Sequence, residues 1–170
     1  DDINICPINS PQPKPSLPYT KDEHCVALWH FDFPNEFGDS CTEYKVENHN
    51  TSETVSMKGF GSARVFNGDS YLELPYNPTL DIKNAITLEA LVKPQLAKNS
   101  FKGDFGNLMT RAEGGADSYS GFVLYIGEGY VAAVIALNNG EFKDITAPLN
   151  LPTDSFTHLA FTYDGNKMKL

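Results

Sequence analysis

Apolar and polar residues alternate along this chain in short runs. In residues 157–163, Leu159, Phe161 and Tyr163 fall on one side of an extended backbone, because successive side chains of a strand point to opposite faces. Residues 86–92 show the same period of two. No stretch carries a long apolar repeat of about 3.6 residues, so the pattern predicts strands rather than helices.

Turn-forming residues separate these runs. Asn-Gly, Gly-Gly, Asn-Pro and Asp-Gly pairs stand between them and suit tight turns. This spacing predicts an all-β fold, a two-sheet antiparallel sandwich or jelly roll. Residues 121–126 and 131–137 are apolar on both sides, which predicts central strands covered on both faces. The full set of runs is 26–31, 63–66, 71–74, 86–92, 107–111, 121–126, 130–137, 141–146, 157–163 and 167–170.

The first 24 residues differ in composition from the rest of the chain. They contain five prolines and few apolar residues. Proline fixes φ and lacks a backbone donor, so such a segment favours an extended linker. We interpret residues 1–24 as a Pro-rich linker or N-terminal extension, and residues 25–170 as one folded domain.

Charge and hydropathy exclude two classes of partner. The chain has 13 Lys plus Arg against 22 Asp plus Glu, a net charge of −9. We therefore expect no nucleic-acid binding, because phosphates would be repelled. No apolar run approaches the roughly 20 residues that span a bilayer, so this segment is not expected to be membrane-spanning.

Cysteines and one sequon bear on the compartment. Cys6, Cys25 and Cys41 form no Cys-x-x-Cys pair. They are either buried thiols or one disulfide with a leftover cysteine; for the second interpretation we favour Cys25–Cys41, with Cys6 reaching elsewhere. Asn50-Thr51-Ser52 is an N-glycosylation sequon at Asn50. These features together favour a secreted protein or the extracellular face of a membrane protein.

Three stretches, in this order, resemble one family. The first is Ala-Leu-Trp-His-Phe-Asp at residues 27–32, the second is residues 61–75, and the third couples residues 86–94 with 156–165. Together they resemble the laminin-G-like jelly-roll family of the concanavalin-A-like lectin/glucanase superfamily, which is related in fold to the pentraxins. The resemblance covers about residues 25–170. Relatives usually have Trp at the place of Leu91 and often at that of Phe156; both residues here remain large and apolar.

The resemblance also implies more strands after the last run. In relatives, the strand that corresponds to residues 167–170 continues into a turn, and further strands close both sheets. We therefore expect the jelly roll to lack its C-terminal strands in this chain, and the native protein to be longer. The alternative is that a separate segment supplies the missing strands.

Calcium is the cofactor that the resemblance implies. Many relatives hold a calcium ion near the sheet rim, and calcium takes six to eight oxygen ligands. Asp32 matches the acidic residue that closes the first family motif, and Asp39 falls in a loop that is rich in Asp and Ser in relatives. We predict these two as ligands of a structural calcium ion; the alternative is that both are solvated loop aspartates.

No catalytic motif is present. The superfamily's glucanases carry Glu-x-Asp-x-x-Glu on one strand, which this sequence lacks. No Gly-x-Ser-x-Gly, Walker loop or dinucleotide motif occurs either, and Cys6, His24, Cys25 and Cys41 fit no zinc-finger spacing. We predict that the domain is not an enzyme, with a glycoside hydrolase as the disfavoured alternative.

Two binding hypotheses remain. The first is an extracellular recognition or adhesion module for glycans or proteins, with Tyr119, Tyr125 and Tyr130 as contacts, since aromatic rings stack on sugars and anchor protein interfaces. The alternative is that these tyrosines only pack within the sheet. The second is a structural spacer within a larger extracellular polymer, suggested by the Pro-rich leader and the leftover cysteine.

Overall fold

The computed structural model describes residues 18–32, 37–82, 84–94, 105–113, 120–137 and 140–170. These residues form an all-β fold with antiparallel pairing throughout and no α-helix in the described ranges. They divide into two compact units, residues 18–80 and residues 81–170. None of the described residues belongs to a helix that is long and apolar enough to cross a membrane.

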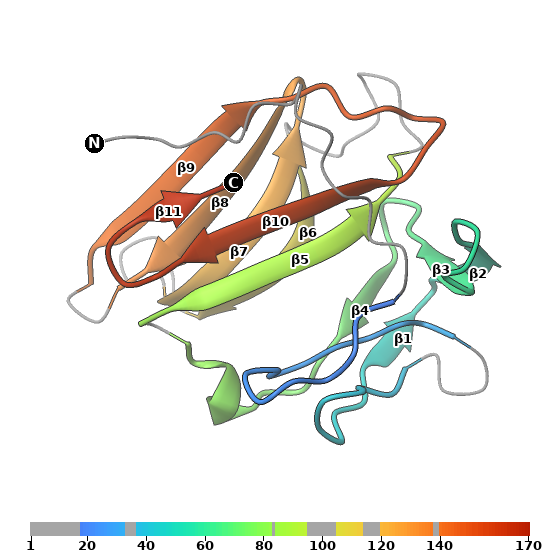
Figure 1. The fold of residues 1–170 in the computed structure, drawn as a ribbon, viewed down its shortest axis with the longest axis horizontal. Coiled ribbons are helices and arrows are strands. Elements are labelled where there is room, and N and C mark those ends of the chain that lie inside the picture. The colour runs from blue at the N-terminus through green and yellow to red at the C-terminus, as the bar shows by residue number, and fades with distance from the viewer. Residues whose placement is uncertain (1–17, 33–36, 83, 95–104, 114–119, 138–139) are drawn as a thin grey trace. The chain divides into compact units, whose positions relative to one another are not determined.

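Two antiparallel sheets make up the unit of residues 81–170 (Figure 1). The larger sheet is a meander of four strands in sequence order: β6 (Phe105–Glu113), β7 (Ser120–Gly127), β8 (Tyr130–Ala136) and β9 (Phe142–Pro148). The smaller sheet has the order β11-β10-β5, from β5 (Ile86–Val92), β10 (Thr157–Tyr163) and β11 (Met168–Lys169). The two sheets form a jelly-roll sandwich.

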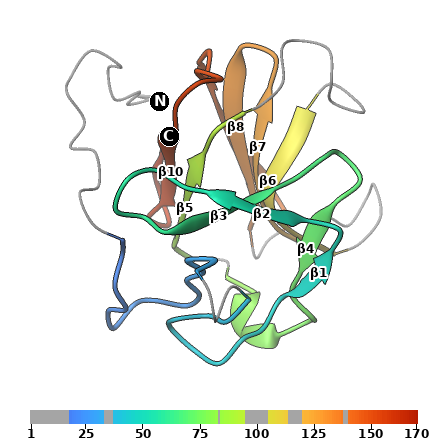
Figure 2. The same ribbon diagram turned by 90° about the vertical axis from the view of Figure 1, so that its right-hand side faces the viewer.

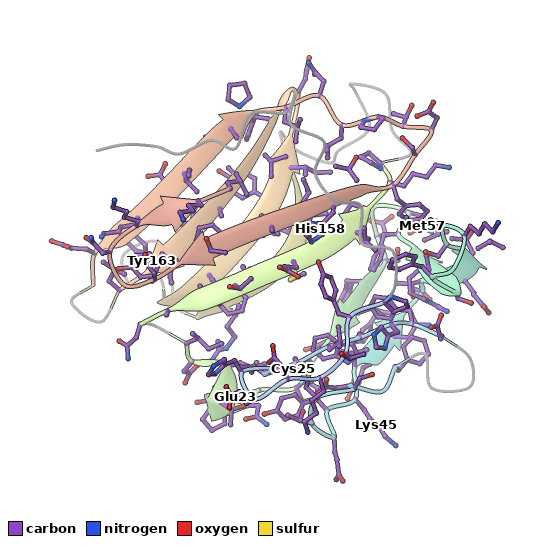
Figure 3. The ribbon with its side chains drawn as sticks, viewed as in Figure 1. Glu23, Cys25, Lys45, Met57, His158 and Tyr163 are labelled. Atoms are coloured by element: carbon purple, nitrogen blue, oxygen red, sulfur yellow. A yellow bond between two sulfur atoms is a disulfide. The ribbon has the colours of Figure 1, made fainter. Side chains whose placement is uncertain are left out.

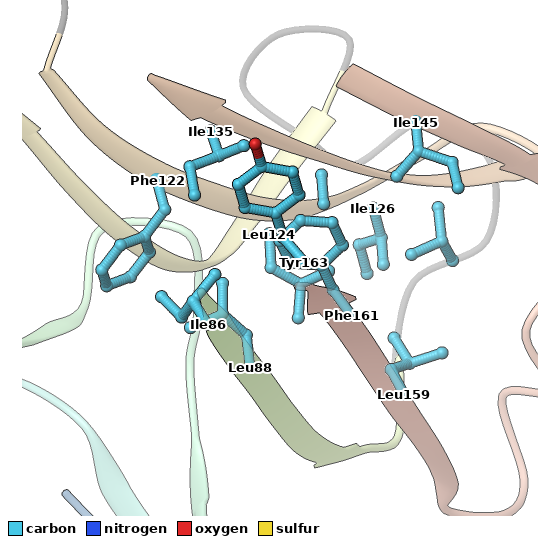
Figure 4. Close-up of a cluster of buried hydrophobic side chains, with 12 residues drawn as sticks. Ile86, Leu88, Phe122, Leu124, Ile126, Ile135, Ile145, Leu159, Phe161 and Tyr163 are labelled. Atoms are coloured by element: carbon cyan, nitrogen blue, oxygen red, sulfur yellow. The ribbon is translucent and has the colours of Figure 1, made fainter. Parts of the chain in front are cut away.

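An apolar core fills the space between these two sheets. Phe161 and Leu124, one from each sheet, have no exposed surface, and Figure 4 shows their side chains meeting between the strands. The alternation in the sequence supplies this core, because every second residue of each strand points inward. The buried cluster is Ile86, Leu88, Phe122, Leu124, Ile126, Val131, Ala133, Ile135, Ile145, Leu159, Phe161 and Tyr163.

Turn chemistry fixes the β10–β11 hairpin. The Asp164 carboxylate accepts hydrogen bonds from the backbone N–H groups of Asn166 and Lys167, at 2.9 and 2.7 Å. Gly165 has a φ of 94°, a conformation that costs glycine nothing. The Tyr163 hydroxyl donates to the Gly165 carbonyl oxygen at 2.8 Å. This turn holds the end of β10 in register with its return strand.

A bulge interrupts β6. Asn107 pairs with Tyr125 and Met109 pairs with Leu124, so Leu108 has no partner of its own. The extra residue lets Leu108 and Met109, which are consecutive, both pack against the core. Asn107 is exposed and lies on the opposite face of the sheet with its partner Tyr125. The bulge therefore switches which of the alternating residues of β6 point toward the core.

Short strands and loops build the unit of residues 18–80. β1 (Glu47–His49) pairs with β4 (Tyr71–Glu73), and β2 (Ser52–Val55) pairs with β3 (Ser62–Val65), as Figure 2 shows. A single 3₁₀ turn, η1 (Pro78–Leu80), follows β4. A disulfide joins Cys25 and Cys41, whose Cα atoms are 5.7 Å apart; Cys25 lies on the irregular segment before β1 (Figure 3). Cys6 lies outside the described residues.

Most of the expected strands are present, and one is not. The runs at 86–92 and 157–163 coincide with β5 and β10, and those at 121–126 and 130–137 form the two inner strands of the larger sheet. The run at 26–31 forms no strand. The reason is that the Leu28 N–H donates to the Asp39 carboxylate, while the Leu28 carbonyl accepts from the Ser40 N–H, both at 2.7 Å. Contacts with the loop around Asp39 therefore occupy the backbone N–H and C=O groups of Leu28, which pairing in a β-sheet would need.

Candidate functional site

The outer face of the larger sheet gathers aromatic and polar side chains. Tyr125 on β7 and Tyr130 on β8 point away from the core, since their neighbours Leu124 and Val131 point into it. Across the ladder, Asn107 pairs with Tyr125, which pairs with Ala132, which pairs with Thr146. We call this surface the tyrosine face and define it by Asn107, Tyr125, Tyr130, Asp144 and Thr146.

A glycine makes room for the Tyr130 ring. Gly127 is the ladder partner of Tyr130, and a Cβ atom built on Gly127 would stand 2.2 Å from the Tyr130 ring. The ring therefore lies over the bare backbone of Gly127, a close approach that only glycine permits. From there it meets Tyr125 edge to face, with ring centroids 6.1 Å apart and an interplanar angle of 89°, an arrangement that aromatic pairs favour.

The charge of Asp144 reaches this pair. Burial, followed by the charges of Tyr130 and Asp144, raises the pKa of the Tyr125 phenol above its ordinary value of 10.0. The Tyr125 hydroxyl therefore remains protonated at neutral pH and can both donate and accept hydrogen bonds. Asp144 and Thr146 on β9 are exposed, so a carboxylate and a hydroxyl stand beside the rings. The tyrosine face thus combines apolar ring surface with hydrogen-bonding groups.

The structure brings together two of the three predicted tyrosines. Tyr125 and Tyr130 are in contact, whereas Tyr119 lies outside the described residues. Reasoning from sequence missed Asn107, Asp144 and Thr146. The last two carried a signal, because in residues 142–148 the polar positions alternate with Ile145 and Ala147, and these two buried residues place Asp144 and Thr146 on the outer face.

Asp39, predicted as a calcium ligand, organises a loop. Its Oδ1 accepts from the N–H groups of Leu28 and Cys41, at 2.7 and 2.8 Å, and its Oδ2 accepts from the N–H and the hydroxyl of Thr42. Burial raises the pKa of this carboxyl group, but the four hydrogen bonds together lower the pKa by more than burial raises it. The pKa of Asp39 therefore lies below its ordinary value of 3.8. A carboxylate offers about four lone-pair sites. All are used, so Asp39 does not fit as a calcium ligand in this conformation.

Asp32, the second predicted ligand, also binds the backbone. Its Oδ1 accepts from the Ser62 N–H at 2.7 Å. Gly61 has a φ of 61°, and a Cβ atom there would lie 2.0 Å from the same oxygen, so glycine permits this close approach. The two aspartates thus share the task of fixing loops in the 18–80 unit. Calcium binding stays a prediction that the geometry of Asp39 does not favour.

Glu89 on β5 faces an imidazole. Its Oε2 lies 3.8 Å from Nε2 of His158 on β10, and His158 is labelled on that strand in Figure 3. A retaining glycosidase needs two carboxylates about 5 Å apart. The Glu-x-Asp-x-x-Glu sequence that would supply them is absent. In the structure, Glu89 is placed against His158.

Comparison with known proteins identifies the family. The model of the laminin-G-like family described as the concanavalin A-like lectin/glucanases superfamily matches residues 66–170. No curated protein matches the chain, and no solved structure matches it either. The matched region contains β4 to β11, hence both sheets of the sandwich and the tyrosine face. The chain belongs to the concanavalin A-like lectin/glucanases superfamily.

Proposed function

We propose that this protein is a non-catalytic recognition module that binds glycans on the tyrosine face. The observation that carries the proposal is the Tyr125–Tyr130 pair, held over Gly127 beside Asp144. The C–H faces of a sugar ring pack on aromatic rings, while sugar hydroxyls hydrogen-bond to carboxylates and hydroxyl groups. The superfamily is compatible with such a module.

The ligand class follows from the charges on this face. Asp144 and Thr146 offer oxygen acceptors, and the chain as a whole carries a net charge of −9. An acidic glycan such as a sulfated polysaccharide would be repelled. A neutral glycan with several free hydroxyl groups fits both the rings and the acceptors.

Glycan-array binding followed by calorimetry tests the proposal. We expect Tyr130→Ala to weaken binding by about tenfold or more, because loss of a stacked ring removes at least about 1.4 kcal/mol. Asp144→Asn should weaken binding by a smaller factor, because the amide keeps one acceptor oxygen. Phe66→Ala is the control, since Phe66 is an aromatic residue that is 51% exposed in the other unit, and it should bind like the wild type.

Two outcomes would contradict the proposal. One is an array without signal above background for the wild type. The other is glycan binding that Tyr130→Ala leaves unchanged. An array without signal, combined with an intermolecular disulfide in the intact protein, would favour the alternative of a structural spacer in an extracellular assembly.

The proposal includes the absence of catalysis. Glu89 is placed against His158 at 3.8 Å, and the catalytic sequence of the superfamily's glucanases is absent. Incubation with β-glucans should therefore release no new reducing ends. Their appearance in the wild type and their loss in Glu89→Gln would show that the domain is a hydrolase.

The proposal also includes an oxidising, extracellular compartment. The Cys25–Cys41 disulfide supports it, because such bonds persist mainly in secreted proteins. Asn50 is exposed, with a φ of 60°, between β1 and β2, so a glycan there would meet solvent. Mass mapping of the protein from its native source should find a bridged Cys25–Cys41 peptide and a glycan on Asn50; free thiols at both cysteines would contradict the compartment.

A further inference from the structure

Three potential metal ligands meet on the two-stranded β1–β4 sheet. In the ladder, Glu47 is directly opposite Glu73, and His49 is directly opposite Tyr71. Because residues two apart share a face, Glu47, His49, Tyr71 and Glu73 all lie on one side of this sheet, whose strands run together in Figure 2. One ligand atom from each of Glu47, His49 and Glu73 lies within 4.8 Å of the other two.

The His49 imidazole points its Nε2 atom at this cluster. Nε2 lies 3.2 Å from Oε2 of Glu73. The atom is shielded from solvent, yet it makes no hydrogen bond within the described part of the chain. The Tyr71 ring stacks on the imidazole with centroids 4.2 Å apart and an interplanar angle of 10°, which fixes the orientation of the ring. The His49 side chain as a whole is 35% exposed, but its Nε2 atom is shielded and faces carboxylates, so a cation there would take the place of the missing hydrogen bond.

The register also places like charges against each other. Glu47 and Glu73 form a directly opposite pair, and like charges at such positions destabilise a ladder. β1 and β4 have only three residues each, so few other contacts could offset this repulsion. A cation between the carboxylates would remove the repulsion and satisfy the imidazole nitrogen at the same time.

We propose that Glu47, His49 and Glu73 bind one divalent transition-metal ion of the zinc class. Zinc is held by imidazole nitrogen and carboxylate oxygen at about 2.0–2.2 Å in tetrahedral geometry. Two ligands at such distances are roughly 3.3 Å apart, and the His49 nitrogen and the Glu73 oxygen are already 3.2 Å apart. Glu47 is exposed, so its side chain can move to close the set.

The chemistry of the ligands selects this class of metal. Calcium and magnesium take oxygen ligands almost exclusively, whereas imidazole suits zinc, copper, nickel and iron. Three protein ligands leave a fourth position, which water fills in an open zinc site. The proposed metal site is separate in sequence and chemistry from Asp32 and Asp39, and it does not depend on the tyrosine face.

Calorimetry on the chelator-treated chain, with any affinity tag removed, tests the site with zinc chloride alone. We expect one zinc ion per chain and a melting temperature that rises with zinc concentration, because a ligand that binds only the folded state stabilises it. His49→Gln and Glu73→Gln should each weaken zinc binding by more than about tenfold, since even outer-shell losses cost about 10–100-fold. Excess calcium should not displace zinc.

A matched control exists in the other unit. His158 also lies near a glutamate, with 3.8 Å between Nε2 and the Glu89 carboxylate, but it belongs to no three-residue cluster among the described residues. His158→Gln should therefore bind zinc like the wild type. If His49→Gln fails to fold, the zinc affinity of Glu47→Gln, which changes an exposed residue, tests the site instead.

Three results would overturn the proposal. They are the absence of zinc binding by the wild type, equal zinc affinity in the wild type and in the ligand variants, and equal competition by calcium. The first of these would mean that no zinc ion bridges the two glutamates. Because the probe is zinc alone, the outcome is independent of glycan binding.

Discussion

Each of the two units of this protein is stabilised internally by a different kind of interaction. In residues 81–170, fifteen described hydrophobic residues are buried, and Phe161, Leu124, Ala133 and Ile135 reach 0% exposure. In residues 18–80, the buried described residues are Cys41, Phe60, Asp39 and Thr51, and these include both buried polar residues of the described chain. One unit therefore depends on apolar packing, and the other on hydrogen bonds and a covalent link.

The hydrogen bonds of the 18–80 unit form around buried polar side chains. Thr51 accepts from the Arg64 guanidinium at its hydroxyl and at its carbonyl, at 3.1 and 2.9 Å, and its own hydroxyl donates to Asn48 at 2.6 Å. In the same manner, Asp39 accepts from three backbone N–H groups, those of Leu28, Cys41 and Thr42. Such polar contacts position loops accurately but contribute less net free energy than core packing, about 1 kcal/mol each against several for a buried aromatic side chain.

The largest expected effect is on the stability of the apolar unit, residues 81–170. Phe161→Ala should lower the free energy of unfolding by about 3–5 kcal/mol, because the substitution leaves a cavity in a fully packed site. Denaturant titration measures the loss, and hydrogen exchange should locate it in β5 and β10. Phe66→Ala, at an exposed position, should change the stability by no more than about 0.5 kcal/mol. Equal losses in the two variants would show that Phe161 is not a core residue.

Reduction of the Cys25–Cys41 disulfide should act on the other unit. The bond joins residues 16 apart, and a closed loop of that length contributes about 3 kcal/mol in the chain-entropy description. We expect hydrogen exchange to accelerate in residues 18–80 while β5–β11 keep their protection. Uniform acceleration across both units would mean that the two unfold as one cooperative body.

The Asp39 carboxylate makes the same unit sensitive to acid. Its pKa is lowered in the folded state, so its contribution to stability is fully present above the unfolded pKa of about 3.9 and is lost as the pH falls through the folded value. Asp39→Asn should cost about 2 kcal/mol at neutral pH and flatten this acid dependence. Denaturant titrations of both proteins at neutral and acid pH provide the check. An unchanged acid profile in Asp39→Asn would assign the dependence to other carboxylates.

The smallest effect concerns the tyrosine face. Gly127→Ala introduces a methyl group at 2.2 Å from the Tyr130 ring, and the ring, being a side chain, can turn away. We expect a cost of about 1 kcal/mol together with weaker glycan binding, since the edge-to-face contact with Tyr125 is lost. Gly140→Ala is a poor control because of its φ of 81°; Ser155→Ala, at an exposed position outside the strands, is suitable. If Gly127→Ala binds the glycan as tightly as the wild type, the position of the Tyr130 ring is not required for recognition.

The sequence predicted the apolar unit better than the polar one. In β5 and β10, alternation alone gave the bounds, because burial of every second residue imposes that pattern. β1 and β2 read Glu-Asn-His and Ser-Glu-Thr-Val and carry no such pattern, so they were not predicted. Their place depends on partners from other parts of the unit.

The candidate sites show the same difference. Tyr125 and Tyr130 were both predicted as contacts, and they lie on the two strands of one local hairpin, whose pairing brings the rings together. The meeting of Glu47 with Glu73 depends on a pairing between strands distant in the sequence, which no local pattern reveals. Asp39 was predicted as a calcium ligand, but in the structure its carboxylate accepts a hydrogen bond from the N–H of Leu28, eleven positions earlier.

The bulge in β6 has a consequence for changes in chain length. Removal of one residue from a paired strand normally turns every residue beyond it to the wrong face. Leu108 is the residue without a partner, and Asn107 and Met109 already occupy successive rungs opposite Tyr125 and Leu124. A deletion of Leu108 alone would thus leave all the neighbouring pairs on their present faces at the expense of one apolar contact. At this point of the larger sheet, the chain can shorten by one residue and still present Asn107 beside Tyr125.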